Sequence, residues 1–124
     1  MALPFTSLAY LYVGTADFER DLAYYRDVLG GEIAWNHTGF GAHVAALRLA
    51  KGPLLLLADH RPAPSCMPVF EVDDLKAAAK MLKKRGWKSD GRSFEIPNGP
   101  CYAFEDPSKN RFAIFENVRP HVFG

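Results

Sequence analysis

The chain has 124 residues, of which 48% are hydrophobic and 23% are charged, so it is long enough for one compact domain with a sizeable core. Its 15 lysines and arginines nearly balance 14 acidic residues, which gives a formal net charge of +1. This balance argues against nucleic acid or an anionic membrane as a partner, because both select strongly basic proteins.

Nothing in the sequence predicts a membrane span or an export signal. The longest apolar run, residues 53–58, is far too short to cross a bilayer, and the N-terminus lacks the pattern of a signal peptide. We therefore expect a cytoplasmic protein. Cys66 and Cys101 do not make a disulfide framework, and we expect buried or half-buried free thiols.

The first half, residues 5–60, predicts a strand, a helix and three further strands. The run SLAYLYV is rich in aromatic and aliphatic residues, as strands are. Thr15 or Asp17 is expected to cap a helix with an apolar stripe, and a Gly-Gly pair ends that helix. The runs EIAWNH, AHVAALRLA and GPLLLLADH then predict three strands separated by turns.

The second half, residues 66–118, repeats this order after a proline-containing linker, residues 61–65. CMPVFEV predicts a strand, and Asp73 or Asp74 is expected to cap a helix that ends at Gly86. FEIPNG, PCYAFE and NRFAIFE supply short strands. The pattern predicts a duplicated βαβββ module, whose two copies pair within the chain or across a homodimer.

This combination resembles the vicinal-oxygen-chelate superfamily, which includes the glyoxalase, bleomycin-resistance and fosfomycin-resistance proteins and the extradiol dioxygenases. The resemblance covers about residues 7–117 and is carried by YLYVGTADFERDLAYYRDVLGGEI, VFEVDDLKAAAKMLKKRGW and FEDPSKNRFAIFE. It implies a single α+β domain over residues 1–124, in which two βαβββ modules form a curved mixed sheet with the glyoxalase/bleomycin-resistance fold. Lys109 departs from the pattern, since this turn more often has glycine in the family.

The resemblance also implies where a metal would be bound. Enzymes of the superfamily hold a divalent cation on the concave face through His and Glu side chains from the first and fourth strands of each module. The corresponding residues here are Leu8, Leu56, Met67 and Ala113, and none of them suits a hard or borderline cation. We therefore predict that the metal site of the superfamily is absent and that no cofactor is bound.

The same face is predicted to carry an apolar and aromatic lining with a few polar groups, because side chains alternate along strands. Such a surface suits a small organic ligand, although the same side chains would also fill a closed core. The predicted ligand-binding residues on the strands are Tyr10, Tyr12, Leu56, Met67, Glu71, Arg111, Ala113 and Phe115.

The middle segment adds three candidates around a Gly-Phe-Gly turn. Trp35 and Phe40 are placed to stack on a flat ring, and His37 to hydrogen-bond it, although aromatic residues on short strands also serve as core. We expect His43 to be a packed or surface strand residue and His60 to lie at the surface.

Three functional hypotheses remain. The first is a metal-independent homodimer, similar to the bleomycin-resistance branch, that sequesters an aromatic or antibiotic-like molecule; a cationic drug is disfavoured because Glu71 is expected beside Arg111. The second is a lyase, isomerase or dioxygenase that uses an atypical metal site with His37, His43 or Glu71, or metal-free acid–base catalysis by Glu71 and Tyr10. The third is a scaffold or regulatory dimer with a filled hollow.

Overall fold

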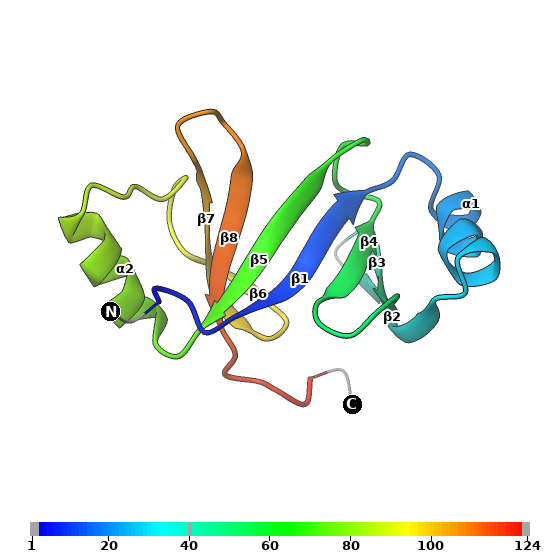
Figure 1. Cartoon of the computed structure of the whole chain (residues 1–124), viewed down its shortest axis with the longest axis horizontal. Coiled ribbons are helices and arrows are strands. Elements are labelled where there is room, and N and C mark those ends of the chain that lie inside the picture. The colour runs from blue at the N-terminus through cyan, green and yellow to red at the C-terminus, as the bar shows by residue number, and fades with distance from the viewer. Residues whose placement is uncertain (1–2, 40, 123–124) are drawn as a thin grey trace. The chain divides into compact units, whose positions relative to one another are not determined.

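The structure is a computed structural model that describes residues 3–39 and 41–122. These residues form two compact units: an N-terminal unit of residues 9–67, residue 40 excepted, and a C-terminal unit of residues 3–8 and 68–122 (Figure 1). The elements, in chain order, are β1 (Ser7–Gly14), α1 (Phe18–Ala23), η1 (Tyr24–Val28), β2 (Glu32–Gly39), β3 (Ala42–Arg48), β4 (Leu54–Ala58), β5 (Cys66–Val72), α2 (Leu75–Lys84), β6 (Phe94–Ile96), β7 (Gly99–Glu105) and β8 (Arg111–Glu116).

The predicted order of elements is confirmed, with one strand, one helical segment and three strands in each half. The first helical segment changes from the α-helix α1 to the π-helical turn η1, which the sequence pattern did not indicate. Among residues 3–39 and 41–122, every helix is too short or too polar to span a bilayer.

In the N-terminal unit, four strands lie in the order β2-β3-β4-β1, with β1 parallel to β4 and the other pairs antiparallel. Asp17 is the N-cap of α1, and its carboxylate accepts a hydrogen bond from the backbone N–H of Arg20 at 3.2 Å. Apolar side chains of α1 pack on one face of this sheet; the buried core is Phe18, Leu22, Ala45, Leu47 and Leu57. The helix therefore covers one face of the sheet.

The C-terminal unit repeats this arrangement with the strand order β5-β8-β7-β6, in which β5 is parallel to β8. Asp74 is the N-cap of α2, and its carboxylate accepts from the N–H of Ala77 at 3.0 Å. Figure 1 shows α2 beside the sheet of this unit, and its Leu75 packs with Val72 and Ile114. Of the two residues predicted as possible caps for each helix, the second is the N-cap in both cases, Asp17 for α1 and Asp74 for α2.

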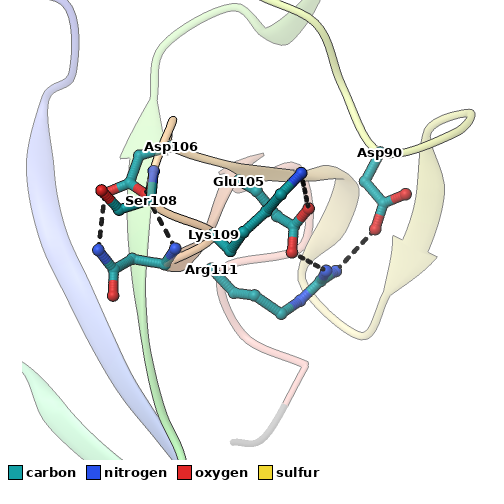
Figure 2. Close-up of polar contacts among 7 residues, drawn as sticks. Asp90, Glu105, Asp106, Ser108, Lys109 and Arg111 are labelled. Atoms are coloured by element: carbon teal, nitrogen blue, oxygen red, sulfur yellow. Dashed lines mark hydrogen bonds and ion pairs between the residues drawn. The ribbon is translucent and has the colours of Figure 1, made fainter.

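The turn between β7 and β8 is held by Asp106, as Figure 2 shows. Its carboxylate accepts hydrogen bonds from the backbone N–H groups of Ser108 and Asn110, each at 2.9 Å, and from the amide of Asn110. These bonds to the ionised form hold the pKa of Asp106 below its ordinary value, with the Asn110 side chain as the largest cause. Lys109 has a left-handed φ of 73°, the conformation that favours glycine at this position.

One expectation about the cysteines is wrong. Cys101 is a buried free thiol, as expected, and burial raises its pKa to about 12. Cys66, however, is exposed, because it is the first residue of β5 and follows the linker directly.

Candidate functional site

The N-terminal unit gathers most of the predicted aromatic ligand-binding residues on one face of its sheet. Val13, Leu55 and Leu57 contact the helix side, so the residues that alternate with them point to the other side, which we call the helix-free face. The strand register lines up residues of all four strands across this face, in the row Trp35–Ala46–Leu56–Tyr12.

A second row on the helix-free face runs beside the first. Here His37 lies opposite Val44, which lies opposite Ala58, which lies opposite Gly14. Tyr10 pairs with Leu54 at the other end of the face. Ala46 and Leu56 are buried, so the first row has an apolar, buried middle between the partly exposed side chains of Trp35 and Tyr12.

Trp35 reaches this face because of a β-bulge. The register pairs Ile33 with Leu47 but Trp35 with Ala46, so Ala34 is an extra residue without a partner. Leu47 packs against α1, whereas Ala46 lies on the helix-free face. Without the bulge, Trp35 and His37 would share the helix side with Ile33. The bulge therefore turns both candidate side chains toward the row that contains Tyr12.

Tyr12 is bonded to a residue that the sequence analysis placed only at the surface. Its hydroxyl lies 3.1 Å from Nε2 of His60, and the two rings meet edge to face with centroids 5.7 Å apart. Burial raises the pKa of the Tyr12 hydroxyl to about 12, the nearby positive charge of Arg61 opposes this shift, and the negative charge of Asp59 adds to it. His60 is exposed, as expected, but its contact with Tyr12 was not foreseen.

The loop that carries His60 and Arg61 crosses the end of β1 directly over Gly14. A Cβ atom on Gly14 would lie 2.0 Å from the carbonyl oxygen of Pro62 and 2.8 Å from that of Arg61. Gly14 follows Tyr12 by two residues on β1, so both residues face the same side of the sheet. The loop therefore crosses on the helix-free face. The N–H of Gly14 also donates to the carbonyl of Ser65 at 3.3 Å. Residues 60–62 therefore border the helix-free face beside Tyr12.

The C-terminal unit has its own helix-free face, on which the predicted site residues Glu71, Arg111, Ala113 and Phe115 lie, whereas Met67, on β5, falls within the N-terminal unit. Glu71 is in register with Phe115 and Cys101, and Ala113 lies between Val69 and Ala103. Ala113 and Phe115 are buried. These residues share a face, as the alternation along the strands predicts.

The expected proximity of Glu71 and Arg111 is wrong. Arg111 lies four residues before the partner of Glu71 on β8, a separation of roughly 13 Å along a strand. Instead, its guanidinium pairs with Asp90 at 2.9 Å and Glu105 at 3.5 Å, as Figure 2 shows. Arg111 therefore stabilises the end of the sheet next to the β7–β8 turn.

The suggested metal ligands His37 and His43 lie on opposite faces of the sheet, so they cannot bind one ion together. His37 is opposite Val44 on the helix-free face, whereas the His43 ring stacks on Phe18 of α1 with centroids 3.8 Å apart. The expectation that His43 is a packed strand residue is confirmed. Phe40 lies outside the described residues. Within those that are described, no group of three His, Cys, Asp or Glu side chains is placed to hold a metal.

Comparison with known proteins identifies the family of this fold. The profile of the Glyoxalase/Bleomycin resistance protein/Dioxygenase superfamily matches residues 7–114. The chain belongs to this superfamily. The predicted glyoxalase/bleomycin-resistance fold is thereby confirmed, and no curated protein matches the chain significantly.

Solved structures show the same fold at low sequence identity. A methylmalonyl-CoA epimerase from Mycobacterium tuberculosis is 16% identical with a TM-score of 0.82, covering 100% of this chain and 97% of that one. A Streptomyces coelicolor methylmalonyl-CoA epimerase variant with bound 2-nitronate-propionyl-CoA is 12% identical with a TM-score of 0.74, covering 92% and 99%. A hypothetical protein from Bacillus halodurans is 10% identical with a TM-score of 0.75, covering 88% and 92%.

The residues that the sequence resemblance assigns to the superfamily's metal positions do not fit a divalent cation. Leu56 is buried in the central row of the helix-free face, between Ala46 and Tyr12. Ala113 is buried at the equivalent position of β8, and Leu8 and Met67 lie in β1 and β5. None of the four side chains offers the nitrogen or oxygen donors that such cations require.

We predict that Gly14→Ala displaces the loop over the end of β1. The added methyl would overlap the Pro62 carbonyl, so the free energy of unfolding should fall by about 1–3 kcal/mol, as measured by urea denaturation. The control is Gly39→Ala, whose methyl would meet only the exposed ring of His37 at 3.1 Å, a side chain that can turn aside. Equal stability of Gly14→Ala and the unchanged protein would contradict this packing.

Proposed function

We propose that this chain is a metal-independent small-molecule-binding member of the superfamily that sequesters a flat aromatic or antibiotic-like compound. The row Trp35–Ala46–Leu56–Tyr12 carries the proposal. Trp35 and Tyr12 are both partly exposed at the two ends of an apolar row, so each offers an aromatic surface on which a planar ring can stack. Apolar side chains at the metal positions support binding over metal-dependent chemistry.

The expected affinity follows from the area that such a ligand buries. A fused two-ring compound that loses about 200 Å² of apolar surface gains roughly 5 kcal/mol, which corresponds to a Kd of about 0.2 mM. Stacking on an indole adds about 0.5–1.5 kcal/mol. The cost of immobilising the ligand reduces this gain, so a natural ligand needs at least one directed polar contact to reach micromolar affinity.

We predict that the neutral probe naphthamide binds to protein treated with a metal chelator. Titration calorimetry should give a sub-millimolar Kd, and Trp35→Ala should weaken it by at least fivefold, because the stacking surface is lost. Tyr24→Ala is the control, since Tyr24 is an exposed aromatic residue of the same unit on η1. Binding that survives Trp35→Ala, or that requires added metal, would contradict the proposal.

A second candidate function is metal-free acid–base catalysis, which the Tyr12–His60 pair favours. A phenol and an imidazole 3.1 Å apart are a proton donor and acceptor of the kind that lyases and isomerases use. In this candidate function, Tyr12 and His60 take the acid–base role that the sequence analysis suggested for Glu71 and Tyr10. Epimerisation requires that a base remove a proton from a carbon and that an acid return one to the other face.

This second candidate predicts proton exchange at an acidic carbon. Methylmalonyl-CoA is a suitable probe, because it is the compound named for the similar epimerases. In deuterated water, catalysis would exchange the proton next to the thioester, and Tyr12→Phe and His60→Gln would each slow this at least tenfold. His121→Gln, which removes an exposed histidine of the other unit, would leave the rate unchanged. Exchange no faster than without protein would leave binding as the function.

The protein is proposed to act as a homodimer. Large apolar side chains are exposed around the end of η1 and the start of β2: Val28 is 68% exposed, Leu29 51% and Ile33 39%. Leu49 joins them, with its Cδ2 2.6 Å from where a Cβ of Gly31 would lie. An exposed apolar group of this kind commonly marks an interface between proteins.

Sedimentation analysis should therefore give the mass of two chains, and Leu29→Lys should convert this species to a monomer, because a buried lysine would lose its hydration. Met81→Lys is the control, since Met81 is also exposed but lies on α2 of the other unit. A monomeric unchanged protein would refute the dimer, as would a Leu29→Lys variant that stays dimeric.

A further inference from the structure

The loop that borders the helix-free face carries a cation without a counter-ion. Nε of Arg61 is buried and has no hydrogen-bond partner within the described residues. Among the ion pairs of residues 3–39 and 41–122, none includes Arg61. A buried Nε–H without an acceptor costs stability, so we expect an acceptor absent from the structure, such as a water, an ion or a ligand, at this position.

The acidic residue nearest to Arg61 along the chain, Asp59, is already engaged elsewhere. The carboxylate of Asp59 accepts a hydrogen bond from the backbone N–H of His43 at 2.8 Å, which ties it to β3. Its negative charge raises the pKa of Tyr12, but among the ion pairs of the described residues none joins Asp59 to Arg61. The positive charge of Arg61 is therefore not neutralised by contact with a carboxylate of its own loop.

Two further hydrogen-bonding groups lie beside Arg61. The Tyr12 hydroxyl is close enough to feel the guanidinium charge, and it is bonded to Nε2 of His60. When Nε2 of His60 carries the hydrogen and donates to the phenol oxygen, the hydroxyl hydrogen of Tyr12 is left for another acceptor. Arg61 and Tyr12 then present donors to one small region, and His60 orients the Tyr12 hydroxyl.

The position of this region is fixed by Gly14. Because the carbonyls of Arg61 and Pro62 lie against the Cα of Gly14, the loop cannot move toward β1, and the donors border the row that ends in Tyr12. Trp35 stands at the other end of the same row, three strands away. At a strand spacing of about 4.8 Å, the row is roughly 14 Å long, which suits a two-ring compound with one polar substituent.

We propose that Arg61, with Tyr12 and His60, is a carboxylate-binding site on the helix-free face, and that the ligand is an aromatic acid whose ring lies toward Trp35. This inference rests on the proposed function, since it identifies the class of ligand that the face binds. Arg61 binds the acid by charge-assisted hydrogen bonds, which are stronger than neutral ones. The Tyr12 hydroxyl donates the additional bond and gives the acid a fixed orientation.

The test compares two probes that differ only in charge, naphthoate and naphthamide, by titration calorimetry at low ionic strength. We expect naphthoate to bind about tenfold to one-hundredfold more tightly, which is the range for a hydrogen bond to a charged group. Arg61→Gln should abolish this preference while leaving naphthamide binding within about twofold. Tyr12→Phe should weaken naphthoate binding by about threefold to tenfold, because one neutral donor is lost.

A matched control separates the local site from net charge. Arg26→Gln removes the same charge from the same unit, but Arg26 is exposed on η1 and pairs with Asp27 at 2.8 Å. It should leave the ratio of the two affinities unchanged. Arg61→Lys should retain part of the preference, since lysine keeps the charge and loses the planar fork of donors.

The outcomes distinguish this inference from the function on which it rests. Equal binding of both probes, or an affinity ratio that Arg61→Gln does not change, would overturn the carboxylate site and leave the aromatic-binding function standing. If Arg61→Gln weakens the binding of naphthoate and naphthamide by the same factor, Arg61 only supports the loop. This result would also overturn the carboxylate site. If neither probe binds the unchanged protein, both proposals fail.

Discussion

A four-stranded sheet that packs against a single helix turns only one of its faces to that helix. In the N-terminal unit, Phe18 and Leu22 pack on Ala45, Leu47 and Leu57, and every residue that alternates with these is turned to the other side. The same constraint applies in the C-terminal unit, where α2 packs on one face of the sheet through other side chains. All of the candidate site residues on the strands follow from it, because they are the residues that the helices leave uncovered.

Local signals in the sequence were sufficient to predict the helices and strands and many of the residues on the helix-free faces. The caps Asp17 and Asp74 were among the predicted residues, because an aspartate before an apolar helical stripe satisfies free backbone N–H groups. The position of Trp35 opposite Ala46 depends on more than alternation. It requires the bulge at Ala34, a residue that resembles any other strand alanine, and no pattern in the strand itself reveals it.

His60 and Arg61 show where reasoning from the sequence ends. Both lie in a segment that reads as a strand end and a proline-containing linker, so a surface position was the reasonable expectation. Their place beside Tyr12 depends on a contact between the loop and Gly14, about 47 residues earlier in the chain by sequence separation. A glycine at the end of a strand signals a break, but it does not tell which backbone approaches it.

The apolar residues predicted at the superfamily's metal positions and the unpartnered Nε of Arg61 fit together energetically. A superfamily member that binds a metal can neutralise an acidic ligand with the ion, whereas Leu56 and Ala113 offer no charge at all. An apolar face alone holds a two-ring compound no more tightly than roughly 0.2 mM, and it discriminates weakly between compounds of similar area. One guanidinium at the border of the face supplies both the missing affinity and the selection for acids, because a ligand without a carboxylate leaves its donors unpaired.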